Sequence, residues 1–63
     1  MKRYSSREIL QMLREDGWYV TEVQGSHYQH KHPTKPGKIT VPHPRKDLPI
    51  KTVASILKQA GLK

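Results

Sequence analysis

The sequence predicts an α+β domain of two layers, in which a helix, a three-stranded antiparallel sheet and a second helix follow one another. Apolar residues recur at helical spacing near both ends of the chain, and β-branched and alternating segments separated by short turns occupy its middle. Strands joined by short turns pair antiparallel, so two amphipathic helices can cover one sheet face and leave the other open to solvent. With 63 residues, residues 1–63 form a single domain.

The first helix is expected over residues 6–16. Ser5-Ser6-Arg7-Glu8 has the spacing of a capping box, in which a serine hydroxyl and a glutamate carboxylate each bind a free backbone N–H. Gly17 suits the left-handed position that ends a helix. One apolar stripe follows from the helical spacing of Ile9, Leu10, Met12 and Leu13.

Three strands are expected between the helices, over residues 18–23, 27–32 and 38–41. Gly25-Ser26 makes the tight turn between the first two, and a turn cluster at residues 33–37 leads into the third. Side chains alternate between the two faces of a strand. In the second strand, His27, Gln29 and Lys31 therefore share one face, and Tyr28, His30 and His32 share the other.

The last helix has the clearest pattern, because apolar residues recur at i, i+3, i+4 and i+7. Thr52 is a candidate cap for its start, and Gly61 for its end. The segment before it, residues 43–49, is a proline-bounded loop that its charged residues keep at the surface. The stripe consists of Val53, Ile56, Leu57 and Ala60.

The net charge of +7 is unevenly distributed along the chain. Residues 1–22 balance four basic residues against four acidic ones, whereas residues 23–63 hold eight basic residues against Asp47 alone. Such asymmetry favours a polyanionic partner, most simply nucleic acid, although excess lysine also serves solubility.

The absence of cysteine excludes disulfides and thiolate zinc sites. No apolar run is long enough to span a bilayer, and charged residues interrupt the apolar residues after Met1-Lys2-Arg3, so we expect neither a membrane span nor a signal peptide. The expected compartment is the cytoplasm.

Four histidines are many for so short a chain, and metal binding is the first hypothesis they raise. His30 and His32 share a strand face, but His27 points the other way, and no Asp or Glu lies between Glu22 and Asp47. Structural zinc needs four ligands at fixed spacing, usually with cysteine among them. We therefore expect no metal site and no cofactor.

The second hypothesis is proton transfer to and from RNA. RNA carries its own nucleophile, the 2′-hydroxyl, so cleavage needs a base that titrates near neutral pH, and imidazole meets that need. His27 follows Gly25, which lets the backbone approach a phosphate closely, and Ser26, which adds a hydroxyl donor. Spacing alone also fits a histidine that merely lies at the surface of a turn.

The other histidines have structural interpretations. His30 is expected to pack beneath a helix with a hydrogen-bond partner, and His32 to serve structure at a strand end. His43 lies in the basic loop, where contact with phosphate and simple solvation remain equally open. Aromatic residues can stack on bases, but a core role is the more frequent one for Trp18, Tyr19 and Tyr28.

The chain contains a set of motifs that resemble, in the same order, those of the HicA toxins of bacterial toxin–antitoxin modules. The resemblance covers nearly the whole chain. These motifs are Asp16-Gly17-Trp18, Gly25-Ser26-His27, His32-Pro33, the run from Ile39 to Pro44 and the closing run from Ser55 to Leu62. The resemblance implies a fold like the double-stranded-RNA-binding domain. It also implies a ribonuclease that acts on mRNA, arrests translation and is held in check by a HicB antitoxin.

The resemblance makes His27 the catalytic histidine, because the family's catalytic residue is the histidine of the Gly-Ser-His motif. We expect neutral His27 to take the 2′-hydroxyl proton while Lys31 or Lys38 steadies the phosphate. An acidic antitoxin would cover this basic face. A non-catalytic RNA-binding module of the same fold is the alternative, and an adaptor is a weaker one. The residues expected to contact RNA are Gly25, Ser26, Lys31, Lys38, His43, Arg45 and Lys46.

Overall fold

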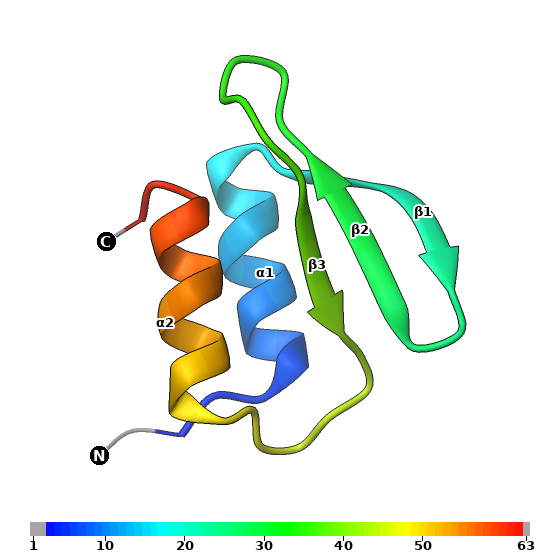
Figure 1. Cartoon of the computed structure of the whole chain (residues 1–63), viewed down its shortest axis with the longest axis vertical. Coiled ribbons are helices and arrows are strands. Elements are labelled where there is room, and N and C mark those ends of the chain that lie inside the picture. Colours follow the sequence, from blue (N-terminus) through cyan, green and yellow to red (C-terminus); the bar gives the residue numbers. More distant parts are fainter. Residues whose placement is uncertain (1–2, 63) are drawn as a thin grey trace.

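The computed structural model describes residues 3–62. Met1, Lys2 and Lys63 lie outside the described residues, and the two lysines are among the basic residues counted in the sequence. The chain forms the predicted α+β arrangement of a helix, a three-stranded antiparallel sheet and a second helix (Figure 1). The elements are α1 (Ser6–Asp16), β1 (Tyr19–Gln24), β2 (His27–Lys31), β3 (Ile39–Pro42) and α2 (Ile50–Gln59).

Helix α1 has both predicted ends. The Ser5 side chain accepts a hydrogen bond from the backbone N–H of Glu8, and the Glu8 carboxylate accepts one from the N–H of Ser5, so the capping box is complete. Gly17 adopts φ 106°, a left-handed conformation, and a Cβ built there would lie 2.8 Å from Nε2 of His32. Both the conformation and the close approach of His32 therefore favour glycine.

The sheet has the order β1-β2-β3, with both pairs antiparallel. At its centre His30 pairs with Val20 on one side and with Ile39 on the other, so these three side chains share a face. The strand ends differ by one residue from the prediction, because Trp18, His32 and Lys38 lie outside the strands. Trp18 instead turns into the core, where it is 2% exposed.

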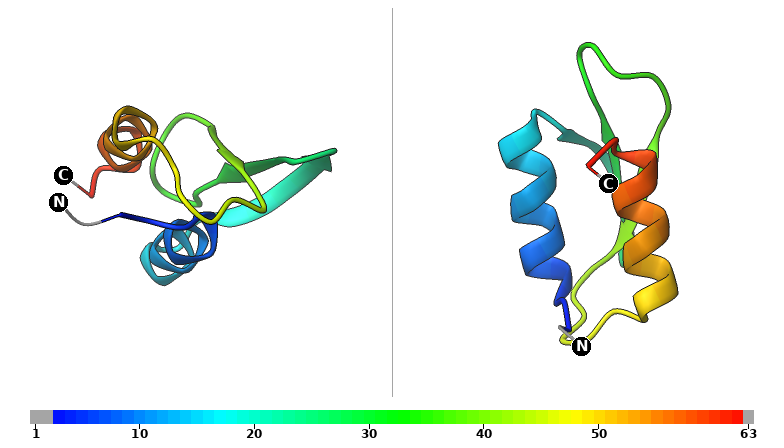
Figure 2. Two further views of the ribbon diagram at one scale, coloured as in Figure 1. Left: turned by 90° about the horizontal axis from the view of Figure 1, so that it is seen from below. Right: turned by 90° about the vertical axis from the view of Figure 1, so that its left-hand side faces the viewer.

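The helices pack along β3, while β1 and the β1–β2 turn extend away from them (Figure 2). All six residues of β1 are exposed. The helices therefore cover the sheet face over β3, as predicted, but do not cover it over β1. The packing explains why Ile39 and Val41 of β3 are buried as predicted. The hydrophobic core consists of Ile9, Leu13, Trp18, Ile39, Val41, Leu48, Val53, Ile56, Leu57 and Ala60.

Helix α2 begins at Ile50, two residues before the predicted cap, so the prediction that Thr52 caps it is wrong. The residue at the N-cap is Pro49, which has no side chain able to cap and whose φ is −55°. Leu48 of the preceding loop is buried and pairs with Tyr4 in an isolated β-bridge, so the loop is not wholly at the surface. Gly61, at φ 73°, ends the helix as predicted.

Neither helix of the described chain is long and apolar enough to cross a membrane.

Candidate active site

His27 is the first residue of β2, directly after the turn formed by Gly25 and Ser26. Its backbone lies between Gln24 of β1 and Pro42 of β3, and its side chain is exposed. Within residues 3–62 no side chain or backbone group forms a hydrogen bond or an ion pair with its imidazole. Gly25 adopts φ 59°, and a Cβ built there meets no atom within 4 Å, so the turn is open to a ligand.

His30 is buried on the opposite face of β2, as predicted, and is 3% exposed. Its Nδ1 donates a hydrogen bond to the backbone carbonyl of Tyr28 at 3.1 Å. Burial, which disfavours the charged form, lowers the pKa of His30 below its usual 6.5, and backbone hydrogen bonds with Ile39 and Tyr28 offset part of that effect. His30 is thus a neutral part of the interior.

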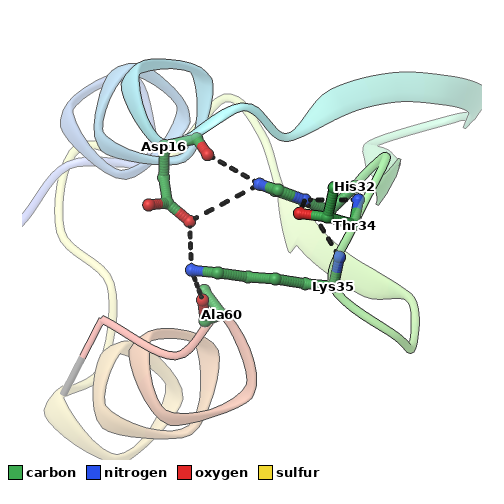
Figure 3. A network of polar contacts seen from close by, with 5 residues as sticks. All are labelled: Asp16, His32, Thr34, Lys35 and Ala60. Atoms are coloured by element: carbon green, nitrogen blue, oxygen red, sulfur yellow. Dashed lines mark hydrogen bonds and ion pairs between the residues drawn. The ribbon is translucent and has the colours of Figure 1, made fainter.

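His32 joins the end of α1 to the β2–β3 loop, as Figure 3 shows. Its Nε2 donates to the backbone carbonyl of Asp16 at 2.7 Å, and its Nδ1 accepts from the backbone N–H groups of Thr34 and Lys35 at 3.0 and 3.1 Å. The ring also meets Trp18 edge-on, with centroids 5.2 Å apart. Both ring nitrogens form hydrogen bonds within the fold, and these contacts agree with the predicted structural role of His32.

Lys35 extends this network to the second helix (Figure 3). Its ammonium donates to the Asp16 carboxylate at 2.5 Å and to the backbone carbonyl of Ala60 at 2.9 Å. The hydrogen bond from Lys35 is the main reason why the pKa of Asp16 lies below its usual 3.8. We call Asp16, His32, Lys35 and Ala60 the polar pin, because they join the ends of both helices to the β2–β3 loop.

His43 follows β3 and is half-buried, so it is neither simply solvated nor confined to the loop surface. Its Nδ1 is 2.7 Å from the Oγ of Ser6 at the start of α1, and its ring meets Tyr28 edge-on at 5.0 Å. Its backbone N–H donates to the carbonyl of Ser26 at 2.8 Å, which attaches it to the β1–β2 turn. The sequence gives no signal for the contact with Ser6, which lies 37 residues away along the chain.

The residues predicted to contact RNA fall at two ends of the sheet. Gly25, Ser26 and His43 lie beside His27, at the end of the sheet that holds the β1–β2 turn. Arg45 and Lys46 follow in the exposed loop, where the backbone N–H of Arg45 donates to the buried Oγ of Ser6 at 2.8 Å.

Lys31 and Lys38 lie at the far end of the sheet. Lys31 is four residues beyond His27 on β2, a distance of about 13 Å along a strand. Lys38 precedes Ile39, which pairs with His30, so it belongs to the same far end. The structure therefore separates both lysines from the imidazole of His27.

Three of the four histidines are held by other parts of the molecule, and the fourth is not. Among the described residues, only the imidazole of His27 has both nitrogens free for an external proton donor or acceptor. An exposed imidazole beside an open glycine turn can exchange protons with a bound ligand near neutral pH. No group of three or more His, Asp or Glu side chains within residues 3–62 is placed to hold a metal ion.

The fold and the site define a small, strongly basic α+β domain with one free histidine on an open turn. Residues 6–62 match the family model that describes the HicA toxin of bacterial toxin–antitoxin systems. The chain belongs to the HicA toxin family and is a toxin of that class, which implies a cognate antitoxin as its partner. No curated protein matches the chain.

Proposed function

We propose that this toxin is a metal-independent ribonuclease that cleaves mRNA, arrests translation in the cytoplasm and uses His27 as its single catalytic histidine. One observation carries the proposal: within the described chain, His27 is the histidine whose ring is exposed and without a partner. Each of the other three rings has at least one nitrogen bound within the fold, to Tyr28, Asp16 or Ser6.

The reaction needs one base and no covalent enzyme intermediate. The neutral ring of His27 takes the proton of a ribose 2′-hydroxyl, and the 2′-oxygen attacks the adjacent phosphorus. The bond between phosphorus and the 5′-oxygen then breaks, and water supplies the proton that the leaving oxygen takes. The products are a 2′,3′-cyclic phosphate and a 5′-hydroxyl.

The residues around His27 suit a phosphodiester backbone. Gly25 lets the chain come close, and Ser26 offers a hydroxyl donor to phosphate. The exposed side chains of Arg45 and Lys46 add positive charge on the same end of the sheet. Lys31, about 13 Å from His27 along β2, and Lys38 hold the RNA backbone farther along.

The decisive experiment compares RNA cleavage by the wild-type protein and by His27→Gln, both in EDTA. The variant keeps a polar side chain of similar size but cannot exchange a proton near pH 7, so we expect at least a 100-fold loss of rate. Gln24→Ala is the matched control, because Gln24 is the exposed cross-strand neighbour of His27 and should leave the rate unchanged.

The ends of the products test the chemistry separately. Cyclic phosphate and 5′-hydroxyl ends support attack by the 2′-oxygen, whereas 5′-phosphate and 3′-hydroxyl ends rule it out. Equal cleavage by His27→Gln and the wild type would remove His27 from the reaction. Tight RNA binding without any cleavage would instead favour a non-catalytic RNA-binding module of the same fold.

We also propose that the antitoxin is a HicB protein that neutralises the toxin by covering the β1–β2 turn. A basic face of this kind attracts an acidic surface, and the complex should weaken as salt rises. The ring protons of His27 report the contact in NMR spectra, because burial by the antitoxin changes their chemical shifts. A complex in which these protons keep the chemical shifts of the free toxin would contradict simple occlusion.

A further inference from the structure

Three hollows on the α1 side of the sheet meet at His43. The first, of about 710 Å³, is lined by Arg7, Leu10 and Arg14 of α1. The second, of about 460 Å³, shares Leu10 and Arg14 and reaches Tyr28 on β2. The third, of about 490 Å³, runs from Arg7 to the loop after His43. We call these three hollows together the α1-side groove.

The groove has a positive rim. Arg7 and Arg14 are seven residues apart on α1 and therefore lie on one face of the helix, about 10 Å from one another along its axis. Both are exposed, and neither forms an ion pair with any side chain of residues 3–62. Glu15 is the acidic residue of the lining. Arg45 and Lys46 add two cations where the groove reaches the loop.

The floor of the groove contains two rings that are held in place. Tyr28 and His43 meet at an interplanar angle of 87°, and Ser6, itself 1% exposed, holds Nδ1 of His43. Because Ser6 occupies Nδ1, the Nε2 atom remains for a ligand in the groove. Tyr19 and Val20 add exposed apolar surface from β1. Cations beside ordered rings form the usual platform for single-stranded nucleic acid.

The groove also adjoins the proposed catalytic turn. The backbone N–H of His43 donates to the carbonyl of Ser26, the residue immediately before His27. His27 and Tyr28 point to opposite faces of β2. A strand of RNA that leaves His27 therefore passes around the end of the sheet, from Ser26 to His43, before it enters the groove. The distance of about 10 Å between Arg7 and Arg14 along the helix lets the two guanidinium groups contact different phosphates of one strand.

We propose that the α1-side groove binds a short single-stranded segment of RNA next to the cleaved bond, with its phosphates on Arg7 and Arg14 and its bases against Tyr28 and His43. The inference rests on the proposed function in taking RNA as the ligand, and it adds a second contact surface to the turn of His27. Substrates with unpaired bases on that side of the cleavage site are then preferred over duplex RNA.

The first test measures binding rather than cleavage, so it does not depend on His27. In a His27→Gln background, Arg7→Gln/Arg14→Gln is titrated with a fluorescent single-stranded RNA octamer. We expect affinity to fall at least tenfold, and the slope of log K against log salt to become shallower by about 1.4 for two lost phosphate contacts.

A matched control comes from the other helix. Arg7 and Arg14 are the second and ninth residues of α1, and Lys51 and Lys58 are the second and ninth residues of α2. Lys51→Gln/Lys58→Gln thus removes the same charge from the same helix positions, outside the groove. We expect it to change affinity less than threefold. Equal losses of affinity in both variants would mean that RNA is held by general charge attraction, and would overturn the proposal that the groove binds it.

The second test concerns the bases and again uses the His27→Gln background. An abasic octamer keeps every phosphate but offers nothing to stack, so the wild-type groove should bind it at least fivefold more weakly than the normal octamer. In Tyr28→Leu that ratio should approach one. Equal binding of the two octamers by the wild-type groove would exclude stacking.

Two further outcomes separate this inference from a protein-binding role of the groove and from the proposed ribonuclease function. If Arg7→Gln/Arg14→Gln loses the antitoxin but keeps RNA, the groove is a protein-binding surface and the inference is wrong. If the wild-type protein cleaves no RNA, the proposed ribonuclease function fails, yet the octamer titrations still show whether the groove binds RNA.

Discussion

His27 and His30 belong to the same strand, yet their imidazoles have opposite surroundings. His27 lies on the open face at the turn, whereas His30 is 3% exposed and faces the core beside Ile39. Three positions of separation place them on opposite faces of a strand, because side chains alternate. The same residue type is therefore open to solvent at one position and packed into the interior at the other.

The buried neutral ring of His30 makes stability depend on pH. Its pKa in the folded protein lies below the usual 6.5, so between these two values the unfolded chain binds more protons than the folded one. Its contribution is complete above about pH 6.5 and is lost as the pH falls toward the lowered pKa. The loss is at most about 1.4 kcal/mol per pH unit.

Urea titrations at a series of pH values check this expectation. The free energy of unfolding of the wild type should fall between pH 6.5 and 5, and His30→Leu should show a smaller fall over the same range. His27→Gln is the control, because its exposed position leaves the buried ring untouched. The same slope in His30→Leu as in the wild type would assign the acid sensitivity elsewhere.

The two helices begin in different ways, and their stability should respond accordingly. Ser5 and Glu8 form a capping box on α1, whereas α2 starts after Pro49 without a side-chain cap. Ser5→Ala should therefore lower the free energy of unfolding by about 1 kcal/mol, which in a domain of this size lowers Tm by roughly 4–8 °C. Thermal unfolding followed by circular dichroism measures the change.

Thr52→Ala provides the contrast. Thr52 lies inside α2, where alanine is the better helix former, so this change should leave Tm unchanged or slightly raised. A loss as large as that of Ser5→Ala would show that Thr52 stabilises the helix start after all.

The polar pin links acid stability to the contact between the helices. The pKa of Asp16 is lowered, chiefly by the hydrogen bond from Lys35, so its contribution is present above about pH 3.8 and is lost as the pH falls through the lowered value. Asp16→Asn should therefore lower Tm at pH 7, and its difference from the wild type should shrink below pH 3.8. A difference in Tm that is constant with pH would contradict an ionic role for Asp16.

Local pattern predicts most of the elements, because each helix and strand carries its own periodicity. Helix α1 has its expected ends, each strand lies within one residue of its expected ends, and the capping box and Gly17 act as expected, whereas α2 begins three residues earlier than a cap at Thr52 would place it. Thr52 fails as a cap because the register of the loop, with Leu48 buried against the core, starts α2 earlier. The position of His27 at the turn follows from local spacing alone.

The contacts that assign roles to the other histidines do not follow from local pattern. His43 with Ser6 joins residues 37 positions apart, and Lys35 with Ala60 joins residues 25 apart. Only the folded packing of α1, α2 and the β2–β3 loop brings such groups together. The separation of Lys31 from His27 is local, because four residues of an extended strand span about 13 Å. The place of Lys38 at the same end of the sheet instead follows from the pairing of Ile39 with His30.

At the scale of the whole molecule, a small core must hold every element. Ten buried apolar residues among residues 3–62 make up that core, and Leu13 is fully buried within it. Leu13→Ala should cost about 2–5 kcal/mol, a large part of the stability that a domain of this size has. The variant should therefore be largely unfolded at 37 °C, which circular dichroism detects.

The comparison residue is Val23, which is 48% exposed on β1. Val23→Ala should cost less than about 1 kcal/mol, because a half-exposed side chain leaves no cavity. Similar losses of Tm for both variants would mean that β1 contributes as much to the core as α1 does.

The four imidazoles differ in how accessible they are to a reagent in solution, so they should differ in reactivity. A reagent that acylates accessible neutral imidazole, such as diethyl pyrocarbonate, meets one open ring on His27, one half-covered ring on His43 and two rings that the fold shields. The first ethoxycarbonyl group should therefore settle on His27 while the circular dichroism spectrum stays that of the native protein. Under the proposed role of His27, the modified protein should lose ribonuclease activity and regain it when hydroxylamine removes the group, with the fold intact throughout.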